Sequence, residues 1–331
     1  MEIIKPSYYD RFRCLAGACP DSCCHEWTIV VDEDAAARYR ALPGELGDRL
    51  RAVMAEEDGD TILTLTADRR CPMWRGDGLC RIQAALGEEA LCQTCHQFPR
   101  LRHDYGDFVE LGLELSCPEA ARLILLGEDE TCTVRVDGGE APDYDEEAMA
   151  ILKESRIHAL ELLKDPALGP GEALAVLLLY GYAVQNELDG GEPATLSPAE
   201  DLARARSLAG QGNAQALVDF FKDLEILTDR WQDRLNCPLG GAWQEGHRIL
   251  ARYFVNRYWL QAVSDYDLIG RVKLTVCACL LLKILGGSLP ETAQLFSKEI
   301  ENDADNVDAL LDGAYTAPAL IDTALLGLLL S

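Results

Sequence analysis

The chain has 331 residues, 48% hydrophobic and 26% charged, so it can bury a large core and has the composition of an ordinary soluble globular protein. Its 56 acidic and 30 basic residues give a formal net charge of −26. Such a chain repels phosphate backbones, which argues against nucleic-acid binding and favours a basic or lysine-rich partner, although acidity also serves solubility alone.

The N-terminal sequence MEIIKPSYYDRFRC has no apolar segment typical of a secretory signal. The longest mainly apolar run, from Leu274 to Leu282, stops at Lys283 and is too short to span a membrane. We therefore expect a cytoplasmic protein without a transmembrane segment, in a compartment where clustered cysteines more often hold a metal than form disulfides. Apolar patches on helical surfaces leave oligomerisation and peripheral membrane contact both open.

The first part of the chain mixes short strands with loops. The segment VELGLELSC (109–117) alternates strictly, which predicts a strand that carries Cys117 on its buried face. Further strands are predicted over 27–32, 61–66 and 131–136, and short helices over 32–42 and 88–98.

From Glu146 onward, apolar residues recur with helical spacing. Segments of this kind cover 146–163, 172–188, 213–231, 247–263 and 268–285. In the first of them, one apolar stripe is expected to contain Met149, Leu152, Ile157, Leu160 and Leu163. Ser197, Pro198 and Glu200 predict a helix start with a capping box. The pattern predicts a bundle of roughly six to eight helices.

The cysteines are unevenly distributed, because ten of the 13 lie between Cys14 and Cys132. This asymmetry indicates a boundary near residue 140, in the polar stretch DGGEAPDYDEE. The predicted fold class is mainly α, with a cysteine-rich metal-binding region containing short strands over residues 1–140, followed by an all-helical domain over 141–331.

Nine cysteines of the first region are set among turn residues at short spacings. They are Cys14, Cys19, Cys23, Cys24, Cys71, Cys80, Cys92, Cys95 and Cys117. Metal centres need thiolates from several turns, and short spacings let one loop supply two of them. Adjacent residues of an extended chain point in opposite directions, so Cys23 and Cys24 are expected to serve different roles. Packing as small hydrophobic residues is the competing interpretation, and we prefer it for Cys277 and Cys279.

The abundance of cysteine over histidine favours an iron–sulfur cluster. Zinc is the alternative, because His25 and His96 stand next to Cys24 and Cys95. We expect these two histidines to lie beside the centre or at the surface rather than to ligate it.

Three stretches around these cysteines, 5–39, 71–100 and 113–125, resemble the flagellin lysine-N-methylase family, and FSKEIENDADNVDALL (296–311) resembles its C-terminal segment. The cysteine region is also similar to a wider group of zinc- or iron-chelating proteins. The resemblance implies methyl transfer from S-adenosylmethionine to lysine ε-amines of flagellin and a [4Fe–4S] cluster. It makes all nine cysteines candidate ligands, without dividing them between one centre and two.

The sequence contains neither a strand–GxGxG–helix stretch nor a CxxxCxxC run, since Cys19, Cys23 and Cys24 form CxxxCC instead. A methyl donor carries a sulfonium and an adenine, so its pocket should offer carboxylates and aromatic faces. One short stretch offers both, and its candidate donor ligands are Tyr258, Asp265, Tyr266 and Asp267. A second candidate group is Tyr8, Tyr9 and Asp10. Core packing is the competing interpretation of these aromatic residues. The alternative function is a non-enzymatic zinc- or iron-chelating or scaffold protein.

Overall fold

Two small sheets and several short helices form the cysteine-rich part of the computed structural model, which describes residues 1–57 and 59–331. The strands are β1 (Glu2–Pro6), β2 (Ile29–Val30), β3 (Met54–Glu57), β4 (Asp60–Leu63), β5 (Arg100–Asp104), β6 (Phe108–Leu113) and β7 (Thr131–Arg135). The helices of this part are α1 (Glu33–Ala41), α2 (Gly44–Val53), α3 (Arg81–Leu86), α4 (Gln93–Gln97) and α5 (Pro118–Ile124).

The larger sheet has the strand order β5-β6-β1-β7, in which β1 is parallel to β6 and antiparallel to β7. Ile3 is paired with Val109 on one side and with Val134 on the other. The smaller sheet has the order β2-β4-β3 and is antiparallel throughout, with Ile29 opposite Leu63. The first strand of the chain thus holds β6 and β7 together.

The rest of the chain is helical. It contains α6 (Glu146–Leu162), α7 (Pro170–Leu188), α8 (Pro198–Leu208), α9 (Ala214–Lys222), α10 (Asp229–Leu235), α11 (Glu245–Tyr258), α12 (Leu268–Leu285), α13 (Leu289–Phe296), α14 (Ala304–Thr316) and α15 (Asp322–Leu329). A π-helical turn, Ser297–Glu301, follows α13. The number of these helices exceeds the six to eight expected, because the periodic pattern does not separate short helices such as α9 and α10. The prediction of a mainly α protein is confirmed.

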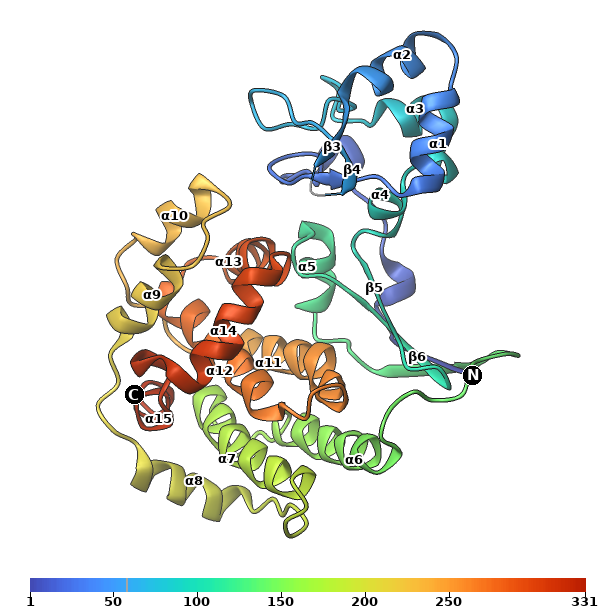
Figure 1. The fold of residues 1–331 in the computed structure, drawn as a ribbon. Coiled ribbons are helices and arrows are strands. Elements are labelled where there is room, and N and C mark those ends of the chain that lie inside the picture. The colour runs from blue at the N-terminus through green and yellow to red at the C-terminus, as the bar shows by residue number, and fades with distance from the viewer. Residues whose placement is uncertain (58) are drawn as a thin grey trace.

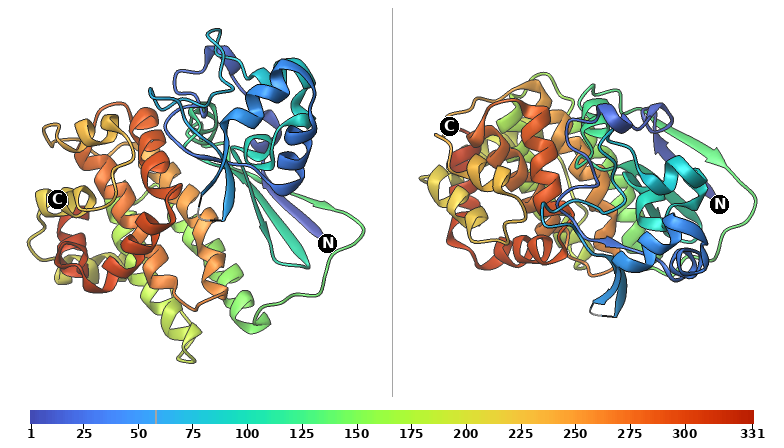
Figure 2. Two further views of the ribbon diagram at one scale, coloured as in Figure 1. Left: turned by 45° about the horizontal axis from the view of Figure 1, so that its top comes forward. Right: turned by 90° about the horizontal axis from the view of Figure 1, so that it is seen from above.

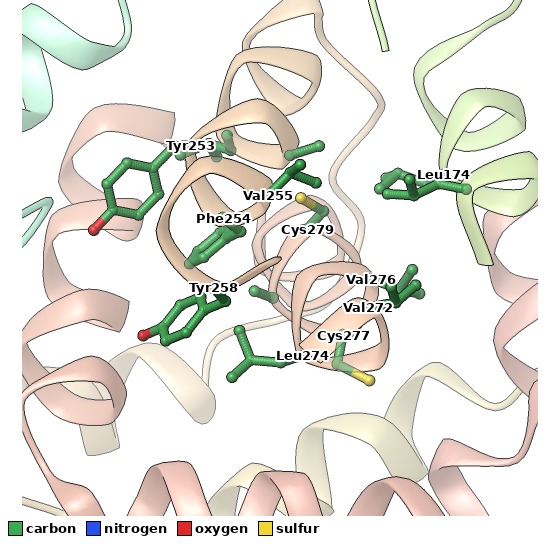
Figure 3. Packing of buried hydrophobic residues seen from close by; sticks show 14 of the residues in the cluster. Leu174, Tyr253, Phe254, Val255, Tyr258, Val272, Leu274, Val276, Cys277 and Cys279 are labelled. Atoms are coloured by element: carbon green, nitrogen blue, oxygen red, sulfur yellow. The ribbon is translucent and has the colours of Figure 1, made fainter. Parts of the chain in front are cut away.

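Helix α12 lies at the centre of the helical body and packs against α7, α11 and α14. Every residue in it except Lys283 is buried, as expected for a helix that is apolar all round. Cys277 and Cys279 are fully buried in this helix, and Figure 3 shows them among apolar side chains that include Leu174 of α7 and Val255 of α11. Their predicted role as small hydrophobic core residues is confirmed.

Two apolar clusters organise the molecule. The larger fills the helical body and includes Phe108, Leu115 and Ile124 from the cysteine-rich part. The smaller is built around Ile29, Tyr39, Leu50, Leu63 and Met73. Figure 1 shows α1–α4 to one side of the helical body with α5 between the two, and the views of Figure 2 agree. The boundary near residue 140 stays a prediction.

Several local expectations need correction. The strand predicted over 109–117 ends at Leu113, and Cys117 precedes α5, which begins at Pro118. The prediction that Cys117 is buried is confirmed. Ser197 does precede α8, but the Ser197 backbone N–H donates to Asp201 and not to Glu200. Ile157 of α6 is 56% exposed, whereas Met149 and Leu152 are buried as predicted.

Among residues 1–57 and 59–331, no helix combines the length and the apolar character that crossing a membrane requires.

Candidate metal centre

All nine candidate cysteines line one cavity of about 420 Å³. They reach it from the loop 14–24, from the segment around Cys71, and from the starts of α3, α4 and α5. All 13 cysteines of the chain are free thiols, and the other four do not line this cavity. The structure therefore brings together the thiols that the sequence analysis singled out.

Helix starts position three of these sulfurs. Cys80, Cys92 and Cys117 each precede a helix with an extended backbone conformation. Burial raises the pKa of the Cys80 thiol and raises that of Cys117 to about 11, while nearby backbone N–H groups of the following helix oppose both shifts. A cysteine directly before a short helix thus recurs three times in this part of the chain.

Several thiols contact one another. The thiols of Cys23 and Cys71 donate to the sulfur of Cys24 and lower its pKa. Cys95 lowers the pKa of Cys92 in the same way, while its own pKa is raised. Thiol groups gathered around one cavity form a soft donor set of the kind that zinc and iron–sulfur centres use. The residues lining the cavity therefore fit a metal centre by their chemistry.

Within residues 1–57 and 59–331, no three Cys, His, Asp or Glu side chains converge closely enough to form a preformed site for one metal ion. His96 lines the cavity beside Cys95, whereas His25 does not and lies 3.4 Å from Glu26.

A buried lysine from the helical body joins the cavity wall. Lys298 of the π-helical turn lines the cavity, and its Nζ lies 3.1 Å from Oδ1 of Asp21 and 3.0 Å from Oε2 of Glu26. Gln294 donates from Nε2 to Asp21 at 2.9 Å and to the carbonyl oxygen of Ser116 at 2.8 Å. These contacts fix the loop between Cys19 and Cys23 against the helical body.

Aromatic and cationic side chains form another part of the wall. The Arg100 guanidinium lies over the ring of Phe12, 5.3 Å from its centroid, and both line the cavity. Trp27 and Phe98 also line it and meet edge to face, with ring centroids 5.3 Å apart. Among the ion pairs of the described residues, none includes Arg100. Arg100 is exposed at the position where it lines the cavity.

The predicted methyl-donor ligands make structural contacts elsewhere. Tyr258 is buried and donates to Glu301, which also pairs with Arg257 at 3.2 Å. Asp265 pairs with Arg271 at 2.9 Å. Asp267 accepts a hydrogen bond from the Gly270 N–H at the start of α12. The hydroxyl of Tyr266 donates to Asp145.

None of these four residues lines the cysteine cavity. In the second candidate group, Tyr8 is buried in the larger cluster and Asp10 pairs with Lys5 at 2.6 Å. The donor-binding role of both groups stays a prediction, and their contacts favour structural roles.

Curated bacterial relatives share part of this chain. The flagellar biosynthetic protein FliU of Salmonella muenchen is 32% identical over 136 residues, which cover 37% of this chain and 76% of that protein. The chain belongs to the flagellin lysine-N-methylase family.

Two further relatives carry the family's activity in their names. The lysine-N-methylases of Salmonella typhimurium and Salmonella choleraesuis are 33% and 32% identical over 136 residues. Each match covers 37% of this chain but only 32% of the relative, so the chain matches about a third of the length of these methylases. No family model and no solved structure matches the chain.

Proposed function

We propose that this protein is a protein-lysine N-methyltransferase that transfers a methyl group from S-adenosylmethionine to lysine ε-amines of flagellin. The observation that carries the proposal is the cavity shared by nine cysteines in a chain related to lysine-N-methylases. The name of the FliU relative supports a flagellar substrate, and the net charge of −26 suits a lysine-bearing partner. A cytoplasmic location, where thiols stay reduced, agrees with 13 free cysteines.

The proposed cofactor is a [4Fe–4S] cluster held by thiolates of the cavity, with zinc as the alternative metal. When bound, such a centre would supply electrons or a positive charge beside the donor. Its ligands would come from the nine cysteines, and the cavity that they all line is the feature that supports metal binding.

The walls of the same cavity offer what a methyl donor requires. The rings of Phe12, Trp27 and Phe98 would exclude water and lie beside the adenine or the sulfonium. The guanidinium of Arg100 would donate hydrogen bonds to the carboxylate of the methyl donor. In polar transfer the amine nitrogen forms the new C–N bond while the donor's C–S bond breaks, and the methylated ammonium then releases a proton to water. The cavity's part is to desolvate and align the two reactants.

The test uses full-length protein purified anaerobically, supplied with S-adenosylmethionine and flagellin, with methylated lysines detected by mass spectrometry. We expect methylation by the wild type and none by Cys92→Ser. The matched control is Cys132→Ser, because Cys132 is exposed on β7 and does not line the cavity. Flagellin whose lysines all stay unmodified by metal-loaded wild-type protein would contradict the proposal.

The alternative is a non-enzymatic zinc- or iron-chelating or scaffold protein. The structural contacts of Tyr258, Asp265, Tyr266 and Asp267 favour it, because they leave the predicted donor pocket without free ligands. Isothermal titration decides between the two. Micromolar binding of S-adenosylmethionine that is lost in Arg100→Met would support the enzyme, whereas lack of binding by metal-loaded protein would support the chelator.

A further inference from the structure

The nine cysteines of the cavity belong to two different parts of the fold. Five of them belong to the smaller apolar cluster or pack against it, namely Cys24, Cys71, Cys80, Cys92 and Cys95. Cys117 instead belongs to the larger cluster of the helical body. Cys14, Cys19 and Cys23 lie outside both clusters, on the loop that crosses between them.

The first set is held together by its own backbone. The Cys71 backbone N–H donates to the carbonyl oxygen of Cys24 at 2.8 Å, which places these two residues side by side. Cys92 and Cys95 lie one helical turn apart at the start of α4, with their thiols in contact. Trp74 forms a β-bridge with Cys80, so Cys80 is tied to the turn that follows Cys71.

A different set of contacts brings the crossing loop to Cys117. Gln294, which is 4% exposed, bonds both Asp21 and the carbonyl oxygen of Ser116 through its side-chain nitrogen. Asp21 lies between Cys19 and Cys23, and Ser116 directly precedes Cys117. One buried amide therefore fixes the loop and Cys117 as neighbours.

A further contact supports this second set. The Cys19 thiol donates to the carbonyl oxygen of Asp21 at 3.2 Å, so its sulfur turns toward the residue that Gln294 holds.

The loop is also fixed from its other side. A Cβ added to Gly78 would lie 2.8 Å from the Cα of Gly17, and one added to Gly17 would lie 2.7 Å from the carbonyl oxygen of Asp77. Two glycines therefore let the loop 14–19 pack backbone to backbone on the loop 76–79. The position of Cys14 and Cys19 beside the cavity depends on this close approach.

We propose that the cavity holds two thiolate-bound metal centres, one bound by Cys14, Cys19, Cys23 and Cys117, the other by four of Cys24, Cys71, Cys80, Cys92 and Cys95. The adjacent Cys23 and Cys24 then serve one centre each. Four thiolates are the complete ligand set of a structural zinc ion or of an iron–sulfur cluster. The inference rests on the proposed metal-binding role of the cavity and is independent of methyl transfer.

The experiment measures iron, zinc and acid-labile sulfide per chain, together with the Mössbauer spectrum, in anaerobically purified full-length variants. We expect Cys14→Ser and Cys117→Ser to lose one centre and to keep the signal of the other. At least one of Cys71→Ser and Cys92→Ser should lose the other centre and keep the first, because only one of the five cysteines is not a ligand. If the centre that contains Cys117 holds iron and sulfide, it is an iron–sulfur cluster. If it holds zinc, it is a single zinc ion. Either result supports a second metal centre. Cys132→Ser is the control and should keep both.

The inference is overturned if Cys14→Ser and Cys92→Ser, both folded by circular dichroism, lose the same metal. It is also overturned if Cys14→Ser keeps all of it. Cys14 is exposed, so its variant carries the test even if Cys117→Ser fails to fold. Two centres without methylation would contradict the proposed activity alone, whereas methylation with a single centre would contradict this inference alone.

Discussion

The Nζ atom of Lys298 lies 3.1 Å from Oδ1 of Asp21, in an ion pair that joins residues 277 positions apart. The side chain of Lys298 is 4% exposed and that of Asp21 is 9% exposed, so the pair is buried. Glu26 forms a second ion pair with the same ammonium. The cysteine loop is therefore held to the helical body by buried charges, which makes its geometry dependent on the π-helical turn Ser297–Glu301.

Replacing Lys298 by Met should destabilise the protein by roughly 3–5 kcal/mol, because Asp21 and Glu26 would lose the cation that compensates their burial. The remaining contact of Asp21 with Arg230, at 3.3 Å, would offset part of this loss. Urea unfolding measures the change. Lys222→Met is the control, since Lys222 forms a loose, half-exposed pair with Asp219 at 3.9 Å and should cost less than about 1 kcal/mol. Equal stability of the two variants would contradict the structural role of Lys298.

Arg100→Met should weaken binding of S-adenosylhomocysteine by roughly tenfold or more, because a charge-assisted hydrogen bond to the ligand carboxylate would be lost. Isothermal titration of anaerobic protein measures this affinity, and the metal content should not change. Arg102→Met is the matched control, since Arg102 pairs with Asp104 at the surface and does not line the cavity. Unchanged affinity in Arg100→Met would remove Arg100 from the donor site.

Cys277→Ser should destabilise the fold by about 1–3 kcal/mol, because it buries a hydroxyl group at a fully buried position of α12. Metal content should stay at the wild-type level. Thermal unfolding combined with metal analysis separates this outcome from that of the cavity cysteines. Loss of metal in a folded Cys277→Ser protein would contradict the division into structural and cavity thiols.

Stability should fall as the pH drops below about 6.5, the unfolded-state pKa of histidine. Burial, aided by the charge of Arg257, lowers the pKa of His103 in the folded protein, and burial likewise lowers the pKa of His247. The unfolded chain therefore binds more protons, so the contribution of each neutral histidine is fully present above that pH and is lost below it.

Urea unfolding at about pH 7.5 and about pH 5.5 measures how the free energy of unfolding changes with pH. The variants His103→Gln and His247→Gln should each lose less stability than the wild type over this interval. His158→Gln is the comparison, and in the structure Nδ1 of His158 on α6 lies 3.3 Å from the hydroxyl of Tyr180. If both variants lost as much stability as the wild type over this pH interval, the effect of burial on the pKa of these histidines would be contradicted.

The sequence predicted much of this molecule because its signals are local. Apolar spacing identified the buried helices, and the nine cysteines were recognised by residue type and short spacing. The same local reasoning failed over 109–117, where the strand ends at Leu113 and Cys117 precedes a helix that begins at Pro118. It also failed at Ile157, whose apolar side chain faces outward because the buried face of α6 contains Ser155 and Ala159 instead.

The remaining features depend on contacts between distant segments. Lys298 and Gln294 look like ordinary helix residues, and only the fold places them against Asp21. The gathering of aromatic and acidic residues in one stretch does not reveal that Tyr258 and Asp265 have partners elsewhere, namely Glu301 and Arg271. The position of Arg100 over the ring of Phe12 likewise joins distant segments.

The most direct test of a thiolate-bound metal in this cavity is anomalous diffraction at the iron absorption edge from crystals grown anaerobically. The account predicts an anomalous peak among the sulfurs of the cavity, with Cys24, Cys71 and Cys92 within bonding distance of metal atoms. A cavity without such a peak, with these sulfurs joined in disulfides or pointing apart, would contradict it.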